Sequence, residues 1–229
     1  MWIVSALLLA LAPPAATPPA PAPAAPAAGR LPLPAVIEKM QKNYDQTKDF
    51  RAHFSQKYTN VAFNRTKVSS GEVAFKKGGR MRWDYDKPDP QMFVSDGKTL
   101  WLYEPADKQA FRQSLKESQL PGAVSFLMGK GKLTDEFDIA FAGEIAYGNK
   151  VDYRLSLKPK QPQATYKSIY FIVDAKSFYV TESVLVNAQG DINDITFSDV
   201  KVNTKVPDSH FKWSVPAGVR TIDAGKMGK

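Results

Sequence analysis

The chain offers few side chains for acid–base, nucleophilic or metal chemistry. It contains no Cys, and neither of its two His residues, His53 and His210, has a metal-ligand partner at usable spacing. Asp84 and Asp86 share one face of a predicted strand and could form a glycosidase-like carboxylate pair. Because basic residues flank both, a surface ladder of ion pairs is the commoner arrangement. With no nucleophile elbow or phosphate-binding loop either, we expect no catalytic residue, no metal, no cofactor and no enzymatic activity.

The strongest signal of the chain is apolar and lies in the aromatic segment 83–105. Its pattern is strand, Pro-rich turn, strand, Asp-Gly turn, strand, which is typical of an antiparallel meander. A sheet this aromatic either packs a dense core or lines a cavity for an apolar ligand. The candidates to line such a cavity are Met81, Trp83, Phe93 and Trp101.

A second apolar feature interrupts the strands at residues 121–128, PGAVSFLM. Proline in the first turn and Gly129 after the last residue predict a short helix. The helix has little polar face of its own, so two interpretations stay open, core packing or a lid over an apolar cavity. The candidate lid residues are Val124, Phe126, Leu127 and Met128.

The elements that position these residues are predicted to be mainly strands. One amphipathic helix is expected over residues 33–44, after which apolar residues recur with period two and predict ten or eleven antiparallel strands, the last over 211–215. So long a sheet must curl, close or split to bury its apolar face. We expect an open (incomplete) antiparallel β-barrel of about 10–11 strands, with short helices forming a lid over an apolar cavity. A two-sheet sandwich is the alternative, but it does not explain an apolar helix between strands.

The first thirty residues are expected to lie outside this domain. Residues 1–12 are similar to a signal peptide, because they form an apolar run that is too short for a stable membrane span. Residues 13–30 form a Pro/Ala-rich spacer. Residues 31–229 then form a single domain. The net charge of +8 fits nucleic acid, anionic lipid or an acidic partner, and export argues against nucleic acid. Without a Cys to carry lipid at the N-terminus, we expect a soluble periplasmic protein.

Several segments resemble the outer-membrane lipoprotein carrier proteins, the LolA family. The most specific is VSDGKTLWLYEP, residues 94–105, preceded by RWDYDKPDPQ. The leading helix, FRAHFSQ from Phe50, PGAVSFLMGKG, and the Pro-x-Gly-Val ending after Phe211 and Trp213 are also similar to that family. The resemblance covers residues 33–222.

This resemblance implies a monomeric half-barrel carrier without cofactor or catalysis. Such carriers accept triacylated lipoproteins from an inner-membrane ABC transporter and bring them across the periplasm to an outer-membrane acceptor, which the sequence does not identify. Met81 and Trp83 would face the cargo at the cavity mouth. In the family an Arg-Pro pair ends the second strand, and the Arg bonds lid carbonyls. Here Lys77-Gly78 stands there, so the latch would be Lys77, a weaker match than the Arg fork, with Arg80 as a substitute.

A second function stays open from these residues. A regulatory module of the cell envelope that senses lipid or lipoprotein shares the same half-barrel, although such proteins usually carry a second domain. An outer-membrane acceptor of the same fold is a third possibility, against which the missing lipidated Cys argues.

Overall fold

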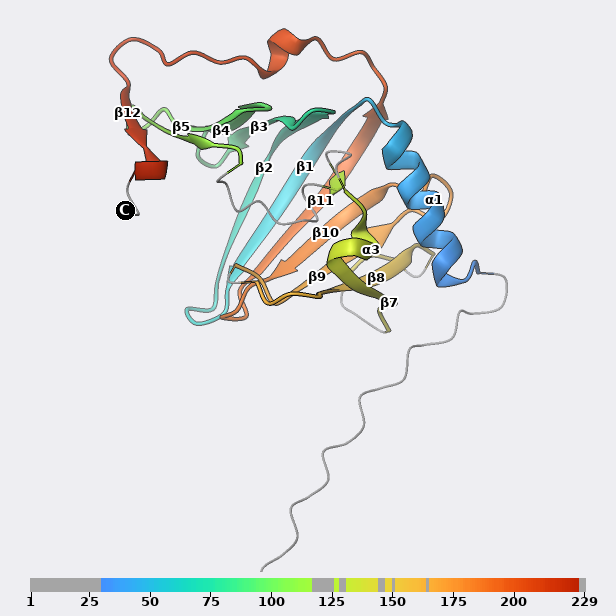
Figure 1. Cartoon of the computed structure of the whole chain (residues 1–229). Helices are drawn as coiled ribbons and strands as arrows, with labels where there is room; N and C mark the ends of the chain where they lie inside the picture. Colours follow the sequence, from blue (N-terminus) through green and yellow to red (C-terminus); the bar gives the residue numbers. More distant parts are fainter. Residues whose placement is uncertain are drawn as a thin grey trace, which may run out of the picture.

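The computed structural model describes residues 30–116, 126–127, 131–143, 147–149, 151–163 and 165–226. Over these residues the chain forms one strongly curved sheet of twelve strands (Figure 1). Helix α1 (Leu33–Gln46) and the short helix α3 (Leu133–Glu136) bury apolar residues in the same core on the inner face of the sheet. The predicted open, mainly β architecture is confirmed. Among the described residues, no helix is long and apolar enough to cross a membrane.

The strands alternate in direction along most of the chain. Their bounds are β1 (Asp49–Asn60), β2 (Arg65–Lys76), β3 (Arg80–Lys87), β4 (Gln91–Asp96), β5 (Thr99–Glu104), β6 (Gln109–Ser114), β7 (Phe137–Phe141), β8 (Tyr153–Pro159), β9 (Ser168–Val173), β10 (Val180–Val186), β11 (Ile192–Val202) and β12 (Arg220–Asp223). Their order in the sheet is β12-β6-β5-β4-β3-β2-β1-β11-β10-β9-β8-β7, so β12 and β7 stand at its two ends.

The end of the chain differs from the prediction. Residues 211–215 are not a strand, because the 3₁₀ helix η1 (Asp208–Phe211) and irregular chain occupy this region. The last strand is β12, which pairs with β6 in parallel, whereas every other pairing is antiparallel. Pro207 and Pro216 bracket the mispredicted strand, and proline lacks the N–H group that a sheet ladder needs.

Helix α1 matches its predicted span within two residues at its end. Pro34 stands in the first turn, where a missing N–H group costs nothing. Val36, Met40 and Tyr44 recur every four residues and form the buried stripe of the helix. This stripe packs the helix onto the apolar inner face of the sheet.

Rows of cross-strand neighbours build the inner face. Phe50 lies opposite Phe75, which in turn lies opposite Met81, and all three are buried in the core that contains α1. The next row joins Trp83 to Phe93. Because side chains of a strand alternate between faces, the residues that alternate with these along each strand point to the outer face of the sheet.

The outer face of β2–β5 is covered by residues 203–219, which we call the C-terminal segment. Phe211 and Val206 of this segment form a small buried cluster with Ala74. The ring of Trp213 lies 5.4 Å from the ring of Trp101, centroid to centroid. This half of the sheet therefore has apolar contacts on both faces.

Candidate apolar binding site

Two residues of the predicted lid, Phe126 and Leu127, lie in a helical turn on the inner face of the sheet. The ring of Phe126 is 2% exposed, with its centroid 4.5 Å from that of Tyr44 on α1 and 6.5 Å from that of Phe171 on β9. Leu127 is 9% exposed. The two residues thus fill the space between α1 and the sheet. Val124 and Met128 lie outside the described residues.

Among the described residues, two small voids border Leu127. One void is lined by Leu127 with Phe50, Phe75 and Lys77, and a second by Leu127 with Phe50, Phe75 and residues of α1, β10 and β11. The larger of the two offers about 10 Å³, the space of roughly one water molecule. Leu127 is therefore closely packed against the described residues that line these two voids.

At the edge of this packed core, the inner face carries three half-buried aromatic rings, Trp83, Tyr85 and Phe93, next to Phe54, which is buried in the core. Trp83 meets the ring of Phe54 edge-on at 4.9 Å, and Tyr85 meets the same ring at 4.8 Å. Phe93 lies 6.0 Å from Tyr85, and burial raises the pKa of Tyr85 to about 12. These four rings, Phe54, Trp83, Tyr85 and Phe93, are called the aromatic cluster below.

A glycine makes the close packing of this cluster possible. Gly71 on β2 lies opposite both Phe54 and Tyr85. A Cβ atom there would stand 1.9 Å from the carbonyl oxygen of Asp84 and 3.0 Å from the Phe54 ring. Any side chain at this position would force the backbone of β3 away from β2.

Of the predicted binding residues, Trp101 needs a correction. Its partner on β4 is Val94, whereas Phe93 pairs with Leu102, so Trp101 and Phe93 belong to opposite faces. The Trp101 ring packs against Trp213 on the outer face. Strand alternation therefore removes Trp101 from the candidate site. Met81 does lie on the inner face, but it is only 3% exposed, buried in the core rather than at its edge.

The predicted latch residues have different partners. The ammonium group of Lys77 donates a hydrogen bond to the carbonyl oxygen of Asp45, in the last turn of α1. Arg80 instead donates to the carbonyl oxygen of Lys77 at 2.9 Å and pairs with Asp208 of the C-terminal segment at 3.5 Å. Lys77 thus contacts a helix that covers the inner face, and the described contacts of Arg80 are directed away from it.

The polar contacts that hold the C-terminal end of α1 could not be predicted from the sequence. The amide of Val180 donates to the hydroxyl of Tyr44 at 3.2 Å, and burial raises the pKa of that phenol. The hydroxyls of Thr47 and Tyr179 lie 2.9 Å apart. Only the buried stripe of α1 was visible in the sequence, because these partners are more than 130 residues away along the chain.

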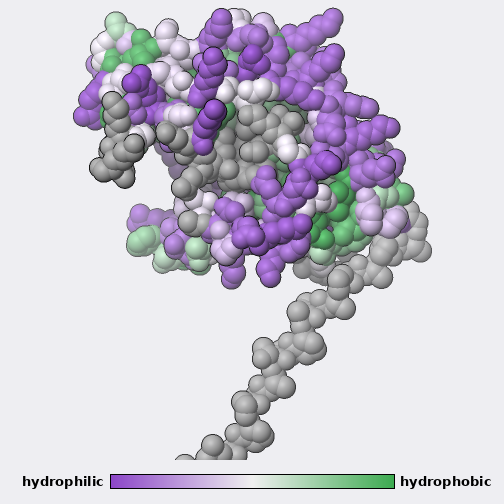
Figure 2. Space-filling view, in the orientation of Figure 1, coloured by the Kyte–Doolittle hydropathy of each residue, from purple (hydrophilic) through white to green (hydrophobic). Residues whose placement is uncertain are grey.

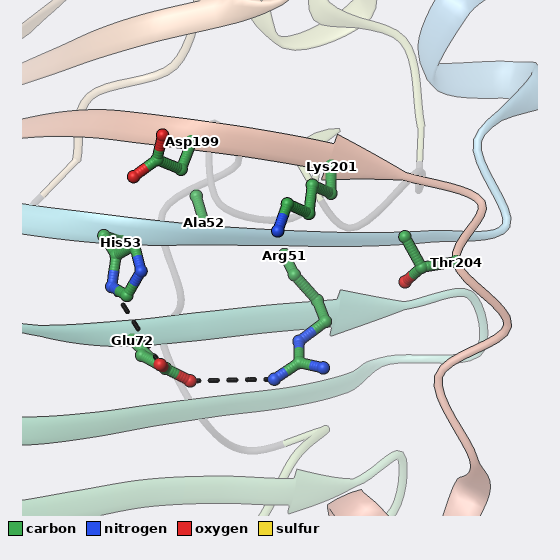
Figure 3. A pocket seen from close by; sticks show the side chains of 7 residues that line it. All are labelled: Arg51, Ala52, His53, Glu72, Asp199, Lys201 and Thr204. Atoms are coloured by element: carbon green, nitrogen blue, oxygen red, sulfur yellow. Dashed lines mark ion pairs between the residues drawn. The ribbon is translucent and has the colours of Figure 1, made fainter.

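Two clefts lie away from the inner face of the sheet. A groove of about 650 Å³ follows the solvent side of α1, from Leu33 to Gln46, and is closed by Lys132 and Thr134. A pocket of about 290 Å³ lies on the outer face of β1, β2 and β11 (Figure 3). Its lining includes the side chains of Arg51, His53 and Glu72.

The outer pocket does not assemble a nucleophile with a base. Glu72 lies 3.6 Å from the Arg51 guanidinium and 4.0 Å from Nδ1 of His53, and all three side chains are largely exposed (Figure 3). The only hydroxyl of its lining, that of Thr204, donates to Asp49 at 3.0 Å. Among the described residues, no group of three or more His, Cys, Asp or Glu side chains could hold a metal.

The acidic pair considered as a glycosidase site is engaged in other contacts. The Arg82 guanidinium donates two hydrogen bonds, of 2.7 and 3.0 Å, to the carboxylate of Asp84. This contact agrees with the predicted surface ladder of ion pairs. Asp86 accepts a hydrogen bond from the Ser70 hydroxyl at 2.9 Å. Neither carboxylate faces the aromatic cluster, because both alternate with Tyr85 along β3.

The fold and this site define a class of protein: a single open sheet whose apolar inner face is closed by helices. A solved structure of the same class, an uncharacterized conserved protein from Thermus thermophilus, superposes with a TM-score of 0.54 at 12% identity, covering 83% of this chain and 98% of that one. The family model of the outer membrane lipoprotein carrier protein LolA matches residues 45–214. The chain belongs to this family.

Proteins named outer-membrane lipoprotein carrier protein are among its relatives. That of Azotobacter vinelandii is 29% identical over 187 residues, which cover 81% of this chain and 87% of the relative. That of Pseudomonas putida (strain KT2440) is 29% identical over 189 residues, with 81% and 87% covered. The resemblance of this chain to the LolA family is thereby confirmed.

Proposed function

We propose that this protein is a periplasmic carrier that binds the acyl chains of lipoproteins released from the inner membrane and brings them to the outer membrane. Its cargo would be triacylated lipoproteins, handed over by an inner-membrane ABC transporter and passed to an outer-membrane acceptor. The protein would act as a monomer, without catalysis. Family membership supports the carrier role in general, and the packing of the inner face supports the way in which cargo is held.

The observation that carries the proposal is the position of Leu127. It sits on an apolar surface formed by Phe50, Phe75, Val180 and Phe197. Displacing the turn with Phe126 and Leu127 would uncover this surface next to the aromatic cluster. Acyl chains would then take the place of the two side chains. The apolar contacts of Phe126 and Leu127 with this surface would be replaced by apolar contacts of the acyl chains.

The free energies explain why such an exchange suits a carrier. Burying a methylene group is worth about 0.8 kcal/mol, so a sixteen-carbon chain resists transfer from a membrane into water by roughly 12 kcal/mol. A carrier must match this affinity and still release its cargo. The contacts of the closed form, which include Phe126 on Tyr44 and Lys77 on Asp45, must break during loading and so lower the net affinity.

A release assay tests the proposal. Spheroplasts that make labelled outer-membrane lipoproteins, with an active lipoprotein transporter, are incubated with the purified protein. We expect lipoproteins to appear in the supernatant in a complex with this protein, in proportion to the amount added. Absence of such complexes would refute the carrier function. A sensing module would bind at most a trace of cargo and would not deplete the spheroplasts of it, which separates the two functions.

A further inference from the structure

The hairpin that joins β1 to β2 exposes an unusual amount of apolar surface. Of the five large apolar side chains that are exposed among the described residues, four lie within residues 58–68, which we call the hairpin tip. They are Tyr58, Val61, Phe63 and Val68, with exposed fractions of 40, 51, 75 and 60%. In Figure 1 the tip projects beyond the neighbouring strands, and in Figure 2 apolar atoms stand among hydrophilic ones at that corner of the molecule.

The turn at the apex is held rigidly in this shape. The amide of Val61 donates to Asp191, in the neighbouring β10–β11 turn, at 2.9 Å, and the amide of Phe63 donates to the side-chain oxygen of Asn60 at 2.9 Å. The amide of Asn64 closes the turn onto the carbonyl of Val61 at 3.2 Å. Phe63 is thus presented to solvent by an ordered turn, and binding through it would cost little conformational entropy.

The charges that the hairpin itself carries are positive. Residues 56–70 contain Lys57, Arg65 and Lys67 and no acidic residue. Three carboxylates come from outside the hairpin: Asp89 pairs with Lys67 at 2.7 Å, Asp191 is engaged in holding the turn, and Asp194 on β11 lies opposite Lys57. Arg65 forms no ion pair within the described part of the chain. An apolar apex with cations behind it complements an anionic lipid surface, where side chains enter the acyl boundary and cations meet the phosphates.

Tyr58 also fits contact with an anionic lipid surface. Its ring lies on β1, three residues before the turn, and its hydroxyl donates to Asp191 at 3.1 Å. An aromatic ring with a hydrogen-bonded polar end is the kind of side chain that is enriched at the level of lipid headgroups. From apex to strand, the tip therefore follows the layering of a bilayer from acyl boundary to headgroup.

From these observations we infer that the hairpin tip is a membrane-contact site, which inserts Val61 and Phe63 into the surface of an anionic bilayer. The site lies apart from the closed inner face. It would hold the carrier against a membrane during exchange of cargo. The inference goes beyond the carrier function proposed above and can be tested without any lipoprotein.

The test uses the absence of Cys from the chain. In the Phe63→Cys variant, a single environment-sensitive fluorophore can be attached to the tip. Val151→Cys provides the matched control, because Val151 is 70% exposed but lies outside the hairpin. Each labelled protein is titrated with vesicles of phosphatidylethanolamine and phosphatidylglycerol, and with vesicles of phosphatidylcholine alone.

We expect the label at position 63 to report an apolar environment with the anionic vesicles, less so at high salt, and the label at 151 to stay in water. In co-sedimentation with the same vesicles, Phe63→Ser should bind about tenfold more weakly than the unmodified protein, because an inserted ring is lost. An unchanged label at 63, equal changes at both positions, or unaltered sedimentation of Phe63→Ser would each overturn the inference. A protein receptor as the sole partner of the tip would produce the first of these results.

The outcome is separable from that of the release assay. Phe63→Ser should still take up lipoproteins in solution, because the tip contributes nothing to the packing around Leu127. A protein that binds vesicles through the tip but extracts no lipoprotein would refute only the carrier function. A protein that extracts lipoprotein and ignores vesicles would refute only the membrane-contact site.

Discussion

Glu182 on β10 and Asp194 on β11 bring two carboxyl groups together on the outer face of the sheet. Partial burial and the charge of Asp194 raise the pKa of Glu182 to about 7, although the amide of Gly148 donates to it at 3.0 Å. Burial also raises the pKa of Asp194, and the charge of Lys57 opposes that rise. The phenol of Tyr147, whose pKa is raised by burial, by the two carboxyl groups and by Tyr170, faces the same site. The native protein therefore holds a proton that the unfolded chain releases at lower pH.

This proton makes stability depend on pH. Because the pKa of Glu182 is higher in the folded than in the unfolded state, its contribution is complete below the unfolded value of 4.5 and is lost as pH rises through about 7. We expect the urea midpoint to fall between about pH 5 and pH 8. Glu182→Gln should flatten this fall, and Glu72→Gln, a change at an exposed carboxylate, should not. If the urea midpoint fell equally with pH in Glu182→Gln and in the unmodified protein, Glu182 would not be the group that causes the pH dependence.

At the scale of single residues, the sequence indicated apolar candidates for the binding site, but it did not show on which face of the sheet each of them lies. In β5 the residues of both faces are apolar or aromatic, so no period of two marks the inner face. Trp101 was assigned to the cavity for this reason. Its true neighbour, Trp213, is more than a hundred residues away along the chain. A local pattern cannot reveal that a distant segment covers the outer face.

At the scale of elements, the bond from Lys77 to Asp45 joins the end of β2 to the last turn of α1. Lys77→Leu should loosen that turn, because a hydrogen bond from a charged donor contributes roughly 1.5–3 kcal/mol, and less where solvent reaches it. Hydrogen exchange at residues 43–47 should become a few times faster. Arg80→Leu is the control, since the described contacts of Arg80 are with the backbone of Lys77 and with Asp208, and not with α1. If hydrogen exchange at residues 43–47 were unchanged in Lys77→Leu, Lys77 would not act as a latch on α1.

The lid turn makes a second prediction at this scale. Leu127→Glu would place a charge against Phe50 and Phe75, so the turn should leave the inner face and no longer offer an apolar surface to cargo. We expect uptake of lipoprotein in the release assay to be lost.

Circular dichroism would verify that the sheet of this variant remains folded, and Val151→Glu would control for added charge at an exposed position. Leu127→Ala, a milder change, should cost about 2–3 kcal/mol of stability and reduce uptake in part. Normal uptake by both variants would show that the turn is only part of the core.

The helix over 121–128 was predicted from its composition, but its packing was not. Its sequence showed an apolar segment between strands, which fits a lid and a core helix equally. The contacts of Phe126 with Tyr44 and Phe171 come from residues some 45 to 80 positions away, so the choice between the two interpretations depends on tertiary structure.

At the scale of the whole molecule, the curved single sheet followed from a simple physical constraint. A run of ten or more short strands with one apolar face has to curl or split, and a helix between strands favours one curled sheet. The number of strands and the parallel pairing of β12 with β6 could not be predicted in this way. A short edge strand that pairs with a distant partner leaves no periodic pattern of its own.

The position of β12 also has a consequence for biogenesis. β12 covers the free edge of β6, and its residues follow those of β6 by more than a hundred positions. While the chain is being made from its N-terminus, β6 therefore offers unpaired N–H and C=O groups until β12 has been made. Such edges recruit strands of other chains and start aggregation. β12 thus covers this edge only late in synthesis, and we expect newly made chains to associate through the edge of β6 until β12 has paired with it.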